Sequence, residues 1–219
     1  MGGYIMASTI NADTTNGVVV TSDTSGEIKL QSAGADIATV NSTGLAMASG
    51  KDLTLSSTAL DASASGIYLG GTASANLLDN YEEGSWTPAL TATTPVTSVT
   101  YLHRTGRYRR IGDLVYVTGA FQISARSGGS GQIVVDGLPF NVSDELPSTA
   151  VEANGNCSYF GALTVAKSSI NVWAFGGTTK LYFTATAAAG STTMPNFNIT
   201  DTSAANFQIR FTISYITDA

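Results

Sequence analysis

The sequence is poor in the residues that most chemical sites need. Its 219 residues include one cysteine, Cys157, and one histidine, His103. A single cysteine excludes an intrachain disulfide and a CxxC metal site, and we expect Cys157 to be a small buried hydrophobic residue. With one histidine beside it, a zinc cluster of nitrogen and sulfur ligands cannot be built, and a serine or cysteine triad is not favoured. We therefore expect no catalytic residue, no metal and no cofactor.

Charged residues and long apolar runs are also scarce. Charged residues make up 12% of the chain and hydrophobic residues 43%, which is unlike a disordered acidic tail. No uninterrupted apolar run approaches the roughly 20 residues of a membrane helix, and residues 1–6 lack the features of a secretory signal. The net charge of −6 argues against binding to nucleic-acid phosphates. We expect a protein that is made in the cytoplasm, without membrane insertion and without a nucleic-acid partner.

Residues up to about Asn76 contain few aromatic side chains and many glycine turns. Short apolar segments predict brief strands at 18–20, 27–30, 37–40, 45–47, 52–55 and 67–69. Such strands bury too little apolar area to offset the loss of about 1–2 kcal/mol of backbone freedom per residue. Because Ile28 alternates with Leu30, and Leu53 with Leu55, one face of this stem is apolar. We therefore favour self-association of the stem over disorder.

The chain after Leu78 has longer alternating patterns. Val115, Val117, Phe121 and Ile123 fall on one face of a predicted strand. The last strand repeats the pattern, with apolar residues at every second position: Phe207, Ile209, Phe211, Ile213 and Tyr215. Further short strands are separated by predicted turns at 128–129, 176–177 and 189–190. About eight strands over ~140 residues are typical of an antiparallel β-sandwich or jelly roll.

A series of motifs fills residues 78–140. They are YEEGSWTP at 81–88, GRY at 106–108, IGD at 111–113, VYV at 115–117 and GLPF at 137–140. These motifs resemble a module of tailed-bacteriophage fibre proteins. The stem pattern, TSDTSGE at 21–27 and IATVN at 37–41, is similar to the N-terminal part of small phage virion proteins. The resemblance implies a homotrimeric fibre whose N-terminal end is fixed to the virion and whose C-terminal β-sandwich head faces the host.

Two acidic doublets are candidates for the carboxylate pair of a glycan-cleaving enzyme. They are Glu82-Glu83 and Asp144-Glu145. A glycosidase needs two carboxylates that face one sugar across a cleft. Adjacent residues on a strand point to opposite faces, so neither doublet makes that pair by itself. We interpret both doublets as solvated loop acids.

The arginines and aromatic residues are the better candidates for ligand binding. Arg107 and Arg109, beside Tyr108, could bind an anionic glycan or a lipopolysaccharide phosphate, because guanidinium groups suit both. Alternatively, the arginines of this region pair with Glu82, Glu83 and Asp113 of the same or a neighbouring subunit. Trp173 is the better candidate for an exposed sugar-stacking ring, whereas Trp86 either stacks on a sugar or fixes the neck to the head.

Together these observations predict an all-β homotrimer. Residues 1–77 form a virion-anchoring stem of short strands, and residues 78–219 form an antiparallel, jelly-roll-like β-sandwich head. The predicted function is structural and adhesive: a bacteriophage fibre on the virion surface, bound to other virion proteins at its N-terminal end, that attaches to a host-surface glycan or protein. Two alternatives remain, namely a capsid head fibre or decoration protein and a small polysaccharide-degrading tailspike.

Overall fold

The computed structural model describes residues 25–53, 67–70, 73–78, 80–145, 151–186 and 194–218. The strand predicted at 18–20, residues 54–55 and the turn predicted at 189–190 lie outside these ranges. The chain divides into two compact units, Met1–Asp61 and Ala62–Ala219, while the stem–head boundary after residue 77 stays a prediction. Within the described ranges, no helix is long and apolar enough to cross a membrane.

The first unit holds a small antiparallel sheet in the order β1-β2-β3. Its strands are β1 (Ile28–Ser32), β2 (Ala35–Asn41) and β3 (Gly44–Met47). The turn between β1 and β2 places Ala33 and Gly34 at positive φ, 51° and 77°, as a tight hairpin requires. Asn41 accepts two hydrogen bonds from Thr43 and so stabilises the turn before β3. The predicted strands at 27–30, 37–40 and 45–47 are therefore present in this unit, whereas residues 52–53 of the strand predicted at 52–55 are not in a strand.

A second short hairpin follows in the second unit. Strand β4 (Ile67–Tyr68) pairs with β5 (Leu77–Leu78), and the 3-10 helix η1 (Ser74–Asn76) lies between them. Asn76 closes the loop, because its backbone carbonyl accepts a hydrogen bond from the Leu69 amide and its side chain donates one to the Leu69 carbonyl.

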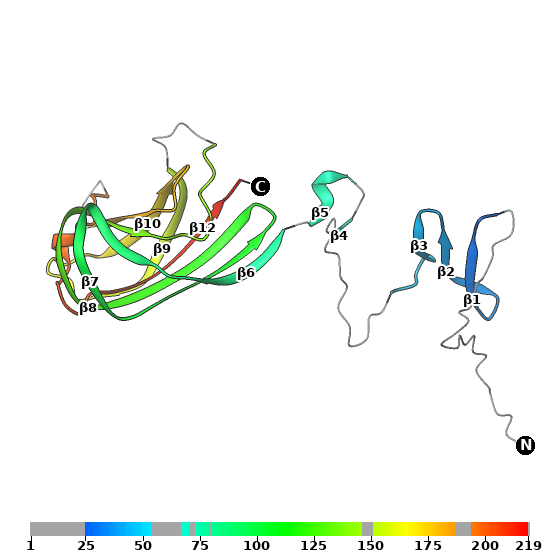
Figure 1. Ribbon diagram of the computed structural model, residues 1–219, viewed down its shortest axis with the longest axis horizontal. Helices are drawn as coiled ribbons and strands as arrows, with labels where there is room; N and C mark the ends of the chain where they lie inside the picture. Colours follow the sequence, from blue (N-terminus) through cyan, green and yellow to red (C-terminus); the bar gives the residue numbers. More distant parts are fainter. Residues whose placement is uncertain are drawn as a thin grey trace, which may run out of the picture. The chain divides into compact units, whose positions relative to one another are not determined.

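The remaining strands form one antiparallel sheet in the order β11-β10-β9-β12-β8-β7-β6 (Figure 1). Their bounds are β6 (Tyr81–Trp86), β7 (Ala89–Ile111), β8 (Leu114–Asp136), β9 (Val151–Gly161), β10 (Ser169–Phe175), β11 (Leu181–Thr186) and β12 (Gln208–Ile216), with the 3-10 helix η2 (Ile199–Asp201) before β12. Strand β8 pairs with β12 through residues 114–122 and with β11 through residues 134–135. The sheet therefore closes into a barrel, and the prediction of an all-β fold is confirmed.

Strands β7 and β8 run side by side along their whole length and bend together (Figure 1). Four irregularities in their register lie between Ala92 and His103 of β7. Opposite this stretch, β8 carries Gly128, Gly129 and Gly131, all at positive φ. The turn predicted at 128–129 is therefore wrong: glycine serves here to bend a continuous strand, not to reverse the chain.

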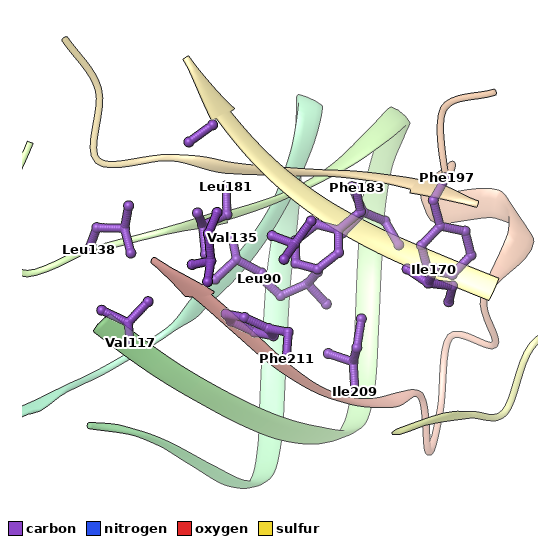
Figure 2. Close-up of a cluster of buried hydrophobic side chains, with 14 of the residues drawn as sticks. Leu90, Val117, Val135, Leu138, Ile170, Leu181, Phe183, Phe197, Ile209 and Phe211 are labelled. Atoms are coloured by element: carbon purple, nitrogen blue, oxygen red, sulfur yellow. The ribbon is translucent and has the colours of Figure 1, made fainter. Parts of the chain in front are cut away.

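The core fills the barrel interior (Figure 2). The apolar residues that alternate along β8, such as Val117 and Phe121, are at most 1% exposed. Strand β12 lies between β8 and β9, and the five alternating apolar residues that run from Phe207, just before it, to Tyr215 are at most 3% exposed. Both predicted inward faces are confirmed.

The Phe211 ring lies at the centre of this packing. Its edge-to-face contacts join Trp86, 6.2 Å away, and Phe183, 5.5 Å away between ring centroids. The ring also covers Gly119, where any Cβ would overlap it. The small residue on β8 and the large residue on β12 are thus one packing unit.

Substitution of Phe211 should therefore loosen the whole head. Phe211→Ala should lower the free energy of unfolding by about 3–5 kcal/mol, because it empties the centre of the core. Thr212→Ala, on the outward side of the same strand, should change it by no more than about 0.5 kcal/mol. Chemical denaturation of both variants measures the difference. Equal and mild effects would place β12 at the periphery of the fold and contradict this description of the core.

Candidate functional site

The candidate site is built on the outer face of β7, β8, β12 and β9. Alternation along β7 turns Gly106 and Tyr108 toward the barrel interior and leaves Thr105, Arg107 and Arg109 exposed on the outside. The register places Arg107 opposite Thr118 of β8, and Thr118 opposite Thr212 of β12. Outward polar positions from strands distant in sequence thus become neighbours.

A groove between two arginines crosses this face. Its lining comes from β7, β8, β12 and β9: Thr105, Gly106, Arg107, Thr118, Gly119, Ala120, Ser158, Arg210, Phe211 and Thr212. The floor is low because Ala120, an outward position between the two arginines, carries only a methyl group. Arg107 and Arg210 are both exposed, and hydroxyl groups stand between them. The groove therefore offers cationic and neutral hydrogen-bond donors on a chain whose net charge is −6.

Neither arginine has an acidic partner within the described residues. The guanidinium of Arg210 lies 5.9 Å from the centre of the Tyr159 ring, a cation–π contact that leaves its N–H groups able to bind an anion. From the usual strand spacing of ~4.8 Å and rise of ~3.4 Å per residue, the two Cα atoms are about 12 Å apart. Two long side chains at that separation can converge on one carboxylate or phosphate group.

The other arginine named from the sequence is placed differently. Arg109 forms an ion pair with Glu83 of β6, with 3.5 Å between Nε and Oε2 and both side chains largely exposed. An exposed pair of this kind contributes about 0.2–1 kcal/mol at most. The predicted pairing with Glu83 is thus present within one chain for Arg109, and the hypothesis of a free ligand-binding guanidinium applies to Arg107 alone.

Tyr108 is separated from its arginine neighbours. Its hydroxyl donates a hydrogen bond to the Glu82 carboxylate, and its ring meets Phe140 edge to face at 5.5 Å. The hydrogen bond to Glu82 raises the pKa of Tyr108 above its ordinary value. Tyr108 alternates to the opposite side of β7 from Arg107, although both residues line a shallow hollow over β6 and β7 together with Arg109 and Glu83. Glu82 and Glu83 lie on opposite faces of β6, as the alternation predicted, and both are exposed, but they stand on a strand and the predicted loop position is wrong.

The two tryptophans differ in environment. Trp86 is 7% exposed, lies over Gly106, and donates a hydrogen bond from Nε1 to the Thr118 carbonyl at 3.0 Å. The hypothesis that Trp86 stacks on a sugar is therefore wrong. Trp173 lies on the outward side of β10, only partly buried, and stacks on Tyr182 at 4.9 Å with 23° between the rings. Phe175 meets both rings edge-on, so Trp173 belongs to a rigid aromatic surface away from Arg107.

Arg210 was missed by the sequence analysis. Nothing around it in the sequence marks a site, since it stands alone on the last strand, about a hundred residues after Arg107. The one feature of the sequence that indicates an outward side chain at Arg210 is its place between the inward apolar residues Ile209 and Phe211. Only the pairing of β12 with β8 brings Arg210 to the groove.

In the described part of the chain, no three His, Cys, Asp or Glu side chains gather as metal ligands do.

The single thiol should be chemically quiet. Cys157 is packed against the core, and burial raises its pKa from 9.0 to about 12, which keeps the thiolate scarce at neutral pH. Alkylation by iodoacetamide at pH 8 should be at least about tenfold slower in the native protein than in urea.

The same shift predicts a pH dependence. The unfolded chain loses the thiol proton near pH 9 while the native chain keeps it, so this contribution to stability declines as the pH rises from about 9 toward 12. Comparison of Cys157→Ala with the parent chain across that range isolates the effect. Equal native and unfolded alkylation rates would contradict the burial of this side chain.

No family model matches this chain, and no curated protein matches its sequence. Among solved structures, the chain is similar to the crystal structure of Dettilon tailspike protein (gp208), with a TM-score of 0.50 and 15% sequence identity. The similarity covers 62% of this chain and 24% of the tailspike, so the matched part corresponds to about a quarter of the length of that protein. At this level of identity, the two proteins share a fold.

Proposed function

We propose that this chain is a bacteriophage tail fibre protein: a homotrimer on the virion surface that is anchored through its N-terminal stem and attaches to the host through its head. The observation that carries the proposal is the fold likeness to a tailspike. The fibre-protein motifs of residues 78–140, found independently in the sequence, support it.

The trimer is supported by the uncovered face of the first sheet. The register of β1, β2 and β3 gathers six apolar residues on one side: Ile28, Leu30, Ala38, Val40, Leu45 and Met47. Among these, Ala38 is buried, whereas Leu30 is 53% and Leu45 55% exposed. A sheet this small with an open apolar face lacks a core of its own. Identical faces of other copies would supply that core.

The head has a second apolar surface. Tyr81, Ile111, Leu114 and Ile216 are direct cross-strand neighbours on β6, β7, β8 and β12. Their exposed fractions run from 37% for Ile216 to 61% for Tyr81. A continuous apolar row across four strands is a common property of surfaces that associate. We assign this row to contacts between heads in the same trimer.

Attachment is assigned to the groove between Arg107 and Arg210. An open groove with unpaired donors suits a ligand that arrives from solution, and a trimer presents three such grooves. Weak individual contacts then add through effective concentration. Labelling intact particles with an antibody against the head tests the placement, since signal at the tail supports it and signal over the capsid would indicate a head fibre or decoration protein.

The proposed adhesin is not an enzyme. A tailspike that degrades polysaccharide would release products, whereas an adhesin retains its ligand unchanged. Incubation with purified host-surface polysaccharide, followed by size analysis, distinguishes the two. Steady release of short chains, lost when one acid is changed to its amide, would overturn the non-enzymatic assignment.

The stem face gives a direct test of the trimer. The parent chain should sediment as a trimer, and Leu45→Asp should dissociate the stem, because it would bury a carboxylate in an apolar contact. Ala46→Asp is the matched control: its site is exposed, adjacent in sequence and on the opposite face. Sedimentation equilibrium measures both. A monomeric parent chain, or the same assembly state for the two variants, would sink the proposal that this face is the stem interface.

A further inference from the structure

A second groove adjoins the first on the outer face of the barrel. It lies over β8, β9 and β12 and is lined by Tyr116, Asn154, Gly155, Asn156, Thr212, Ile213 and Ser214. Thr212 lines both grooves, so the two are adjacent along β12. The outward side chains that line this second groove are amides, hydroxyls and one phenol, with no charged group among them, whereas the Ile213 side chain is buried in the core.

The two asparagine amides of this groove differ in their hydrogen bonds. Thr212 donates a hydrogen bond to Oδ1 of Asn156 at 2.9 Å, which orients the amide and leaves its Nδ2 as a donor. Asn154 is exposed, and no hydrogen bond engages its side chain within the described residues. Oriented and unoccupied amides beside hydroxyl groups match the alternating donors and acceptors of sugar hydroxyls.

Gly155 keeps this groove open. Its backbone approaches β12 so closely that a Cβ would overlap the Thr212 carbonyl and meet the Cα and Cβ of Ile213 at 2.8 Å. A larger residue here would push β9 away from β12 and separate Asn154 and Asn156 from Thr212. The close approach thus fixes the amides against the strand that also carries Arg210.

An aromatic ring stands on the far side of the groove. Tyr116 of β8 is 44% exposed and pairs in register with Ser214 of β12. Beyond the amides, Asn154 pairs with Trp173 of β10. From β8 to β10 the outer face therefore runs from a phenol through amides to an indole, a distance of about 14 Å at ~4.8 Å per strand. Rings of this kind offer apolar faces on which sugar rings stack.

We propose that the two grooves form one binding site for an acidic oligosaccharide of the host surface. Its anionic group binds between Arg107 and Arg210, and an adjacent uncharged sugar lies against Tyr116 and forms hydrogen bonds with Asn154 and Asn156. This inference rests on the proposed function, because it names the ligand class of the attachment face. In this arrangement, the first groove binds the charged group of the oligosaccharide, and the second groove binds a neighbouring uncharged sugar of the same chain.

The test uses the full-length protein and an immobilised panel of purified bacterial surface polysaccharides. The panel has three arms: uronic-acid polysaccharides, polysaccharides with phosphodiester links, and uncharged polysaccharides. We expect binding in an acidic arm that weakens as salt is added, and the two acidic arms distinguish carboxylate from phosphate. Carboxyl reduction of a bound uronic-acid polysaccharide should abolish its retention. Binding confined to the uncharged arm, or no binding to any arm, would contradict the inference.

Variants locate the site on the protein. Arg107→Ala and Arg210→Ala should each weaken binding at least about tenfold, because each loses a charge-assisted contact. Asn156→Ala and Tyr116→Ala should each weaken it about fivefold without altering its salt dependence. Arg109→Ala and Asn141→Ala are matched controls, since Arg109 is paired with Glu83 and Asn141 is exposed outside both grooves. Each control should change affinity less than about twofold.

Failure of this inference is distinguishable from failure of the proposed function. Binding of the labelled protein to intact host cells that is lost after protease treatment, with no retention by polysaccharide, would indicate a protein receptor. The adhesive function would then stand and the oligosaccharide site would fall. Binding to polysaccharide that the four site variants leave unchanged would also refute the site, because the ligand would lie elsewhere on the head.

Discussion

The barrel depends on strand β8, which pairs with β7 along one edge and with both β12 and β11 along the other. Strand β8 is 23 residues long, and its residues 114–122 pair with β12 while residues 134–135, near its end, pair with β11. These two pairings close the sheet around a continuous apolar core. The bend between them requires glycine at positive φ, which is why Gly128, Gly129 and Gly131 lie in the second half of the strand. Without that bend the same strands would form an open sheet with exposed edges.

Closure of the barrel also decides the chemistry of its outer face. Because side chains alternate along a strand, each inward apolar residue of β8 and β12 places the residues next to it on the outer face. The buried Ile209 and Phe211 therefore keep Arg210 at the surface. Packing of Phe211 against Gly119 brings β12 close to β8. The groove between Arg107 and Arg210 is therefore a consequence of the core, and its geometry is as rigid as the packing beneath it.

The two units reach stability by different means. The second unit buries large side chains such as Phe121, Phe183 and Phe211 at no more than 1% exposure. In the described part of the first unit, Ala38 is the single buried hydrophobic residue, and Leu30 and Leu45 on the same face are more than half exposed. A second unit that folds around its own core and a first sheet with an open apolar face are consistent with the proposed trimer.

The sequence by itself determined the all-β class, the inward faces of β8 and β12, and the separation of Glu82 from Glu83. Each follows from the two-residue period of a strand, which is a local property. The sequence did not determine that β8 continues through Gly128 and Gly129, because glycine is compatible with both a turn and a bend. Adjacency in the sequence suggested one ligand-binding group of Tyr108 and Arg107, although the alternation of a strand places their side chains on opposite faces. Only the tertiary structure decided that Arg210 meets Arg107 and that Asn154 and Asn156 lie beside Tyr116, because the pairing of distant strands depends on how the whole core packs.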